Sequence, residues 1–429
     1  MRFVSTRGPA PAVGLGQAIA AGLAPDGGLY VPEALPRLDP QAIDPAGSLA
    51  EVAAAILRPY FEGDPLAAQL DAICREALDF DTPLRPLPWL DAQLLELFHG
   101  PTAAFKDVGA RFLAACMRRL RTPDDPPLTI LVATSGDTGA AVAAAFHRMP
   151  GIRVVVLYPD GRVSPRQAHQ LGCFGDNVRT YRVAGSFDDC QRMVKAAFAD
   201  TELRERVPLA SANSISLGRL LPQMSYYART ALTLHAETGR AHGFVVPTGN
   251  LGNALACLWA RSMGLPVGPV HLACNANAVL ADFLAGAEYA PRASIATLAN
   301  AMDVGAPSNV ERLRWWADDP GLRAQITAGS VDDAAIQAEI RQLAREHKLT
   351  ICPHTATALH ELERMREAGD MRPWVAVATA HPAKFESVVE PLAGIAVPVP
   401  EALGQLLQRP SRVDCLPAEE DALRSALSD

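Results

Sequence analysis

Apolar runs that end in turn residues and lead into alanine-rich stretches recur along most of the chain. From Leu128 onward the runs are LTILVATSGDTG, RVVVLYPDG and NVRTYRVAG, and a second set comprises GFVVPTGNLGN, PVHLACNAN and WVAVATAHPAKF. Helical patterns such as AIQAEIRQLAREH and TATALHELERMREAG lie within the second set. Strand, turn and helix in alternation predict parallel sheets. We therefore expect an α/β protein with two open parallel-sheet lobes and a cleft between them.

The first part of the chain has a different pattern and predicts an N-terminal extension domain. It holds the turn-rich segment APDGGLYVPEALPRLDP and two predicted helices, AGSLAEVAAAILRPYF and PLAAQLDAICREAL. We expect this domain over residues 1–95, a small α/β domain over 96–225 and a large cofactor-binding α/β domain over 226–429, with residues 96–110 contributing Lys106 to the large domain. The segments DDPGLRAQ and VPVPEAL are expected to be surface turns.

Composition narrows the class of protein without identifying it. The chain has 429 residues, 49% of them hydrophobic, which is enough to bury two or three domain cores. Its 39 basic and 47 acidic residues give a net charge of -8 with no basic stripe, which argues against nucleic acid and anionic membranes. A small polar substrate is the better expectation.

Cysteine and histidine usage points to a reduced, cytoplasmic protein without a metal. The eight cysteines include no CxxC pair and the ten histidines no HExxH, so neither a disulfide framework nor a zinc site is indicated. The N-terminus lacks the apolar core of a signal peptide, and we expect no membrane span. The oligomeric state is expected to be a monomer or a homodimer.

Lys106 is the first candidate for chemistry. It stands in HGPTAAFKDVGARFL, where turn and strand residues give way to a helical pattern. Phe105 offers an apolar wall that disfavours the ammonium form, so the pKa of Lys106 should fall toward the range where a neutral amine attacks an aldehyde. Pyridoxal phosphate is the cofactor that such a lysine suggests. Taken alone, the stretch fits a solvated lysine at a helix start better.

Two turns after predicted strands could hold anions. In ATSGDTG an apolar strand runs into small and hydroxylated residues at a helix N-terminus, which attracts a carboxylate or phosphate. Ordinary helix capping by Ser135 or Asp137 explains the same residues. In VPTGNLGN, Gly249 and Gly252 allow close backbone approach while Asn250 and Asn253 add donors. Neither turn has the Walker or GxGxxG pattern, so a nucleotide is disfavoured.

Several weaker candidates have a structural explanation beside the functional one. A clamp for an oxyanion could be formed by Asn213, Ser214 and Arg219, although such a segment is usually a turn. Two capping boxes are predicted, one from Ser164, Pro165 and Gln167, the other from Ser308 and Glu311. His354 is either a satisfied buried histidine or a catalytic one. Thr379 follows a strand and could bond a pyridine nitrogen or simply cap the strand.

Taken together and in order, the motifs resemble the threonine synthase family. They are GLAPDGGLYVPE, FHGPTAAFKD, ATSGDTG, GRVSP, NSI, VPTGNLGN, MDVGAPSNVER, CPHTA and ATAHPAKF. The resemblance runs from Leu23 to Phe385 and is to the bacterial and fungal branch, within the tryptophan synthase β-like, fold type II pyridoxal phosphate enzymes. GLAPDGGLYVP and TAHPAKF are the most diagnostic of these motifs.

The resemblance implies a role for each matching position. Lys106 would hold the cofactor and then carry protons, and Thr379 would bond the pyridine nitrogen. Asp137 would lie near the cofactor hydroxyl. The cofactor phosphate would bind to Gly249, Asn250, Leu251, Gly252 and Asn253. The substrate would contact Thr134, Ser135, Thr138, Asn213, Ser214 and Arg219.

The implied reaction converts O-phosphohomoserine and water to threonine and phosphate by β,γ-elimination and β-addition, the last step of threonine biosynthesis. Ser216, Leu217 and Gly218 depart from the family's continuation of NSI and weaken the phosphate contacts assigned there, and HTATA leaves the role of His354 open. Alternatives are a pyridoxal phosphate phospholyase or a serine/threonine dehydratase, a non-catalytic protein that keeps the fold, and a nucleotide-binding α/β protein.

Overall fold

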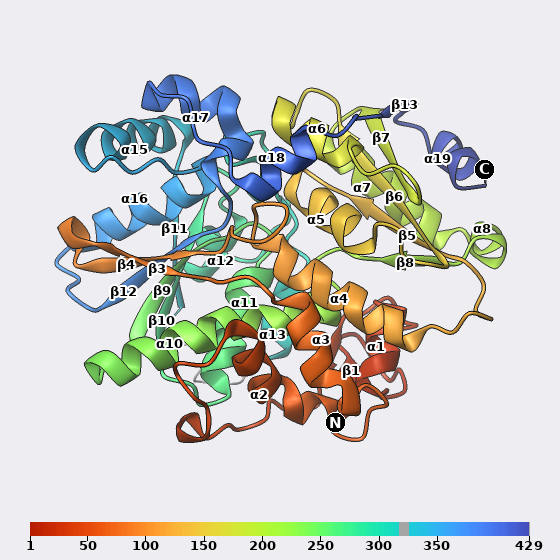
Figure 1. Ribbon diagram of the computed structural model, residues 1–429, viewed down its shortest axis with the longest axis horizontal. Coiled ribbons are helices and arrows are strands. Elements are labelled where there is room, and N and C mark those ends of the chain that lie inside the picture. The colour runs from red at the N-terminus through yellow and green to blue at the C-terminus, as the bar shows by residue number, and fades with distance from the viewer. Residues whose placement is uncertain (317–325, 429) are drawn as a thin grey trace.

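Two mainly parallel sheets and an N-terminal segment make up the chain, as the computed structural model of residues 1–316 and 326–428 shows (Figure 1). The larger sheet lies on the left of the view, the smaller on the right, and the N-terminal segment below both. The expected α/β fold with two parallel-sheet lobes is confirmed. The predicted turn DDPGLRAQ lies outside the described residues.

The larger sheet has the strand order β11-β10-β9-β12-β4-β3. Only β3 runs antiparallel, to its neighbour β4, at one edge of the sheet. The strands are β3 (Leu84–Leu87), β4 (Ala92–Glu96), β9 (His242–Pro247), β10 (Val267–Cys274), β11 (Ile326–Ser330) and β12 (Trp374–Ala378). The helices of this part are α10 (Met224–Thr238), α11 (Gly252–Ser262), α12 (Val279–Leu284), α13 (Val310–Trp315), α15 (Asp333–Glu346), α16 (Pro353–Glu367) and α17 (Glu386–Ala393), with η3 (Pro88–Leu90), η5 (Asn300–Met302) and η6 (Pro382–Phe385). The helix α4 (Lys106–Leu120) packs on helices of the smaller sheet and of the N-terminal segment.

The smaller sheet is parallel throughout and has the order β13-β7-β6-β5-β8. Residues of β5 and β6 are buried on both faces, as the unbroken apolar runs in their sequences require. The strands are β5 (Leu128–Ala133), β6 (Ile152–Pro159), β7 (Val178–Ala184), β8 (Leu209–Ser211) and β13 (Asp414–Pro417). The helices are α5 (Asp137–Phe146), α6 (Pro165–Gly172), α7 (Phe187–Ala199), α8 (Thr201–Arg206), α18 (Glu401–Leu407) and α19 (Glu420–Ser428), and α9 (Leu217–Leu220) with η4 (Leu221–Gln223) leads back to the larger sheet.

The N-terminal segment packs its helices onto α4 and α10 and shares their apolar core. Its hairpin pairs β1 (Phe3–Ser5) with β2 (Tyr30–Pro32), and its helices are α1 (Leu15–Ala21), η1 (Pro40–Ala42), α2 (Leu49–Phe61), η2 (Ala67–Gln69) and α3 (Leu70–Ala77). Both predicted helices are therefore present. Ser48 and Glu51 form the capping box that starts α2.

The sheets draw on chain segments from both sides of the expected domain boundaries. The strand β3 and most of β4 precede residue 96 yet belong to the larger sheet. The strand β13, near the C-terminus, belongs to the smaller sheet, where it pairs with β7. The division at residues 95 and 225 stays a prediction, and these strands show where the chain crosses it.

Candidate active site

Lys106 is the first residue of α4, and the loop before it is closed by Asp107. The buried Asp107 carboxylate accepts hydrogen bonds from the Thr102 backbone N–H at 2.8 Å and from the Thr102 hydroxyl at 2.7 Å. A Cβ on Gly100 would lie 2.6 Å from Asp107 Oδ2, so this turn requires glycine. The Phe105 N–H donates to the Thr379 carbonyl at 2.8 Å, which ties the loop to the end of β12. The HGPTAAFKD motif thus fixes where Lys106 begins its helix.

The surroundings of Lys106 favour a neutral amine. Its Nζ lies 4.3 Å from the centre of the Phe105 ring and makes no hydrogen bond within residues 1–316 and 326–428. Burial, helped by the nearby Arg219 guanidinium and opposed by Asp137, lowers the pKa of Lys106 to about 7. A substantial fraction of the amine is then neutral near pH 7 and can attack an aldehyde. This confirms the expectation drawn from Phe105.

Lys106 faces a cavity whose walls come from both sheets. Asp137 starts α5 after β5 of the smaller sheet, whereas Thr379 and the segment after Pro247 follow strands of the larger sheet. Carboxyl ends of parallel strands are where α/β proteins bind ligands. The lining residues are Phe105, Lys106, Asp137, Ser214, Arg219, Gln223, Pro247, Thr248, Gly249, Asn250, Leu251, Gly252, Asn253, Ala301, Met302, His354 and Thr379.

The turn between β9 and α11 is constrained by its backbone conformation, by a close contact with η5 and by side-chain hydrogen bonds. Leu251 has φ of +64°, a left-handed conformation that a branched residue rarely adopts. A Cβ on Gly249 would lie 2.7 Å from Met302 Cα, so this glycine serves the packing of η5 against the turn. Both polar atoms of the Asn250 side chain have a partner, because Nδ2 donates to Ser214 Oγ at 2.5 Å and Oδ1 accepts from the Ser308 N–H at 2.6 Å. The first-turn N–H groups of α11 lack intrahelical acceptors and are suited to an anion.

Three buried polar groups on the cavity wall have no hydrogen-bond partner among the described residues. They are Arg219 Nε, Asn253 Nδ2 and His354 Nδ1. Asn253 uses its Oδ1 to accept hydrogen bonds from Tyr226 and Tyr227, at 2.6 and 2.7 Å, so its amide nitrogen can only donate. Arg219 donates to the Ala212 carbonyl at 2.6 Å but forms no ion pair with any described residue. Burial lowers the pKa of Arg219 to about 10, with Asp107 opposing.

This excess of donors defines the ligand that the cavity fits. Buried donors without acceptors are costly, and a ligand rich in anionic oxygens would satisfy them. Such a ligand should also carry an aldehyde that reacts with Lys106, a phosphate that binds at the N-terminus of α11 and a ring nitrogen that accepts a hydrogen bond from the Thr379 hydroxyl. The Thr379 hydroxyl makes no hydrogen bond to the described part of the chain. Pyridoxal phosphate has all of these groups.

Asp137 is held by a residue that the sequence analysis missed. Lys384, in η6, lies with its Nζ 2.9 Å from Asp137 Oδ1, and both side chains are almost fully buried. Gln167 also donates to Asp137 Oδ1, at 3.0 Å. Burial raises the pKa of Asp137, but Lys384 and the hydrogen bonds outweigh it, so the pKa is lowered and the carboxylate stays charged. The lysine inside TAHPAKF, between apolar neighbours, was the available signal.

The turn before α5 is capped by neither residue considered for it. Thr134 is buried, and its hydroxyl accepts hydrogen bonds from the N–H groups of Gly136 at 3.0 Å and Gly139 at 2.9 Å. Gly136 occupies the N-cap position without a side-chain bond. Capping by Ser135 or Asp137 is therefore wrong. Ser135 and Thr138, half-buried on the same turn, lie outside the cavity wall.

For the remaining predicted residues, the structure confirms one of the two expected capping boxes and contradicts the other. Ser164 and Gln167 form the expected capping box. Ser308 and Glu311 do not, because Glu311 instead bonds Thr6 and pairs with Arg7 at 2.8 Å, tying α13 to the N-terminal segment. Ser214 reaches the cavity wall, whereas Asn213 and Thr134 do not. Asn213 keeps a buried side-chain oxygen with no hydrogen-bond partner among the described residues.

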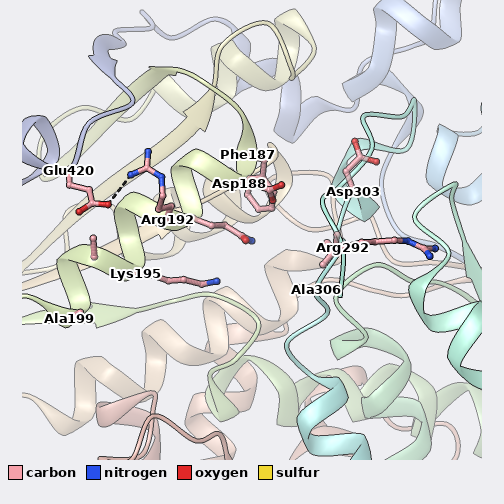
Figure 2. A pocket seen from close by; sticks show the side chains of 13 residues that line it. Phe187, Asp188, Arg192, Lys195, Ala199, Arg292, Asp303, Ala306 and Glu420 are labelled. Carbon is pink, nitrogen blue, oxygen red and sulfur yellow. Dashed lines mark hydrogen bonds and ion pairs between the residues drawn. The ribbon is translucent and has the colours of Figure 1, made fainter. Parts of the chain in front are cut away.

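A second hollow, of about 580 Å³, lies between α7 and the segment from Arg292 to Ala306 (Figure 2). Arg192 pairs with Glu420 at 2.8 Å, and Arg292 pairs with Asp282 at the same distance. Its arginines are thus already compensated. No group of three metal-binding side chains occurs in the part of the chain that the structure describes, and none of its helices is long and apolar enough to cross a membrane.

Comparison with known proteins agrees with this geometry. A family model described as pyridoxal-phosphate dependent enzyme matches residues 76–382, and models of the threonine synthase N terminus and C-terminal part match residues 2–78 and 355–427. Threonine synthase from Haemophilus influenzae is 38% identical over 429 residues, covering 100% of this chain and 99% of that protein.

Solved structures give the same result. The crystal structure of threonine synthase from Escherichia coli matches with a TM-score of 0.92 at 37% identity, and that of PLP-bound threonine synthase from Brucella melitensis with 0.89 at 35%. Each covers 100% of this chain and 99% of the matched chain. Fold and cavity therefore define a pyridoxal-phosphate dependent enzyme. Within that class, the chain belongs to the threonine synthase family, as its motifs predicted.

Proposed function

We propose that this protein converts O-phosphohomoserine and water to threonine and phosphate with pyridoxal 5'-phosphate, as the last step of threonine biosynthesis. One observation supports this above the others. Lys106, with its pKa of about 7, faces a cavity whose other unsatisfied polar groups all donate hydrogen bonds. A cofactor phosphate, a substrate phosphate and a substrate carboxylate would supply the missing acceptors.

The residues that would hold the cofactor follow from their positions. Lys106 would bind it covalently through Nζ, the turn from Gly249 to Asn253 would bind its phosphate at the start of α11, and the Thr379 hydroxyl would meet its ring nitrogen. When bound, the cofactor supplies an aldehyde that links to amines and a ring that takes up the electron pair left when a proton leaves the neighbouring carbon. Each of these residues lines the cavity.

Lys106 would carry the protons of the reaction. The Lys106 amine would accept the proton that leaves Cα of the bound substrate. It would also accept the proton from Cβ and return protons to Cγ, from which phosphate departs, and finally to Cα, after water has added to Cβ. A base with a pKa near the working pH serves each of these steps, and burial gives Lys106 that value.

Arg219 and the turn before α5 would bind the two ends of the substrate. Arg219 has no carboxylate partner among the described residues, so its charge is available for the departing phosphate. Asp137 is neutralised by Lys384, so the turn can receive the substrate carboxylate through Ser135, Thr138 and the first-turn N–H groups of α5 without an opposing free charge.

We also propose a cytoplasmic monomer or homodimer. All eight cysteines are free thiols and seven of them are buried, which suits a reducing compartment. Light scattering on the purified protein would give the oligomeric state, and a trimer or larger assembly would contradict this part of the proposal.

The products formed from O-phosphohomoserine test the reaction. Purified protein loaded with pyridoxal phosphate should release threonine and phosphate in equal amounts. Phosphate accompanied by an oxo acid in place of threonine would instead identify a phospholyase. Turnover of serine or threonine, with none of O-phosphohomoserine, would identify a dehydratase.

A further inference from the structure

His354 lies at the cavity wall with one ring nitrogen satisfied and the other not. It is the second residue of α16 and its side chain is 2% exposed. The ring packs 5.0 Å from that of Phe385, measured between centroids. The Ala301 N–H, in η5, donates to His354 Nε2 at 3.1 Å, whereas Nδ1 is buried without a partner among the described residues.

The bond from Ala301 decides where the ring proton sits. A ring nitrogen that accepts a hydrogen bond cannot carry a proton, so in the neutral ring Nε2 is unprotonated and Nδ1 is protonated. His354 is therefore a donor on the side that has no partner. A buried donor of this kind lacks an acceptor that a ligand in the cavity could supply.

The surroundings also keep the ring neutral. Burial lowers the pKa of His354 to about 4, Lys106 and Lys384 act in the same direction, and Asp137 opposes them. A second proton would have to sit on Nε2, where it would face the Ala301 N–H. At neutral pH the ring thus offers a hydrogen without a positive charge.

We propose that His354 is a ligand-binding residue whose Nδ1–H donates a hydrogen bond to an oxygen of the cofactor or substrate bound beside Lys106. The inference deepens the proposed function and rests on it. A neutral donor fixes an oxygen atom without adding a second cation next to Lys106, whose amine must stay basic enough to accept a proton. A charged side chain at this position would stabilise the oxygen but also hold Lys106 less basic than its proton transfers require.

Two substitutions separate this role from simple packing. In His354→Asn, the side-chain amide nitrogen can take the place of Nδ1 as donor, but the acceptor for Ala301 is lost. In His354→Gln, the longer side chain can place an oxygen near Ala301, but the donor at Nδ1 is lost. If His354 only supports η5, glutamine is the better substitute. Our proposal predicts that asparagine is better.

The experiment measures the dissociation constant of pyridoxal phosphate and the KM and kcat for O-phosphohomoserine in both variants and the wild type. For His354→Gln we expect about a tenfold loss in cofactor affinity if the oxygen belongs to the cofactor, or about a tenfold rise in KM if it belongs to the substrate. His354→Asn should stay within about threefold of the wild type in the same quantity. Unchanged values in His354→Gln, or a larger loss in His354→Asn, would overturn the proposal.

Two further measurements test the role of His354 separately from the proposed reaction and without substitutions. A wild-type protein that binds pyridoxal phosphate but fails to turn over O-phosphohomoserine would contradict the proposed reaction, while the cofactor affinities would still decide the role of His354. Nitrogen NMR of the wild-type histidine rings avoids the variants altogether. The Nδ1–H signal of His354 should shift on addition of cofactor or of substrate, and a signal unmoved by both would also overturn the proposal.

Discussion

Lys384 Nζ lies 2.9 Å from Asp137 Oδ1, and this buried ion pair joins the two lobes beside Lys106. Lys384 belongs to η6, after the last strand of the larger sheet, and Asp137 begins α5 of the smaller one. Lys384 also donates to the Thr102 carbonyl at 2.7 Å, in the loop that leads to Lys106. One ammonium group therefore holds the turn before α5 and the loop that leads to Lys106 in a fixed relation.

Breaking this pair should destabilise the protein strongly. Lys384→Met leaves Asp137 charged and buried, and we expect a loss of about 3 kcal/mol in the free energy of unfolding. Asp137→Asn should cost a similar amount, and the double variant less than the sum of the two single changes. Urea denaturation measures all three. The exposed pair Arg2 and Glu33, 3.8 Å apart, is the control and should contribute well under about 1 kcal/mol. Strict additivity of the two buried changes would contradict the account.

The pKa of Lys106 predicts how cofactor capture depends on pH. A folded-state pKa of about 7, below the ordinary 10.5, means that the neutral amine fraction rises through pH 7. The rate at which cofactor-free protein captures pyridoxal phosphate, followed by its absorbance, should be half-maximal near pH 7. The unfolded chain keeps this proton up to about pH 10.5, so Lys106 destabilises the folded state fully below pH 7, and this destabilisation is lost as the pH rises from 7 to 10.5.

The Arg219 guanidinium should contribute to the pH at which cofactor capture is half-maximal, the midpoint of capture. Its charge lowers the pKa of Lys106, so Arg219→Gln should move the midpoint of capture to higher pH. Arg219→Lys keeps a positive charge and serves as the matched control, with a smaller shift. A midpoint near 10.5 in the wild type, or a downward shift in Arg219→Gln, would be inconsistent with the electrostatics described above.

Gly109 lets α4 approach the backbone that carries Arg219. A Cβ there would lie 2.7 Å from the Arg219 carbonyl oxygen, so Gly109→Ala must push α9 away from α4. We expect about 1–3 kcal/mol of destabilisation and a clear loss of turnover. Gly404, inside α18, is the control because its added Cβ would meet Val399 only at 3.9 Å. Gly404→Ala should be neutral or stabilising by up to about 1 kcal/mol, and equal effects of both changes would refute the argument.

Asp303 fixes the segment that carries Ala301 and Met302 to the cavity. Its carboxylate accepts hydrogen bonds from the Thr297 hydroxyl and N–H at 2.7 and 3.0 Å and from the Asn275 and Asn277 amides at 2.8 and 3.2 Å. Asp303→Asn would replace one of these accepting carboxylate oxygens with an amide N–H group, which would face the donor groups of Thr297 or the asparagines. We expect a loss of about 2 kcal/mol in stability and weaker cofactor binding. Thermal denaturation and cofactor titration measure both, and a variant with wild-type values would exclude this role.

The sequence predicted the local elements of the fold well and its long-range pairings less well. The runs that became β5, β6, β9, β10 and β12 are largely apolar on both faces, so each of these strands was visible in its own residues. Nothing in β13 indicates that it returns to the smaller sheet, because its pairing with β7 depends on chain segments more than two hundred residues apart. The same holds for β3 and β4, which precede Lys106 but complete the larger sheet.

The site divides in the same way. Lys106 and the turn at Gly249 could be found from neighbouring residues, since an apolar wall and a glycine-rich turn are local features. The apolar neighbours of Lys384 were a signal that it is buried, but its partner could not be predicted, because Asp137 lies in the other lobe. Asn250 was expected to add a donor for the ligand, yet its side chain joins Ser214 to Ser308. Only the folded structure shows which polar atoms remain unsatisfied.

The attachment point of the cofactor tests the central claim most directly. The chain has four lysines, Lys106, Lys195, Lys348 and Lys384, and two of them, Lys106 and Lys384, lie at or beside the cavity. Borohydride reduction of the cofactor-loaded protein followed by peptide mass mapping should place the added cofactor mass on the peptide that contains Lys106 and on none of the others. Label on Lys384, or label spread over several lysines, would contradict the account.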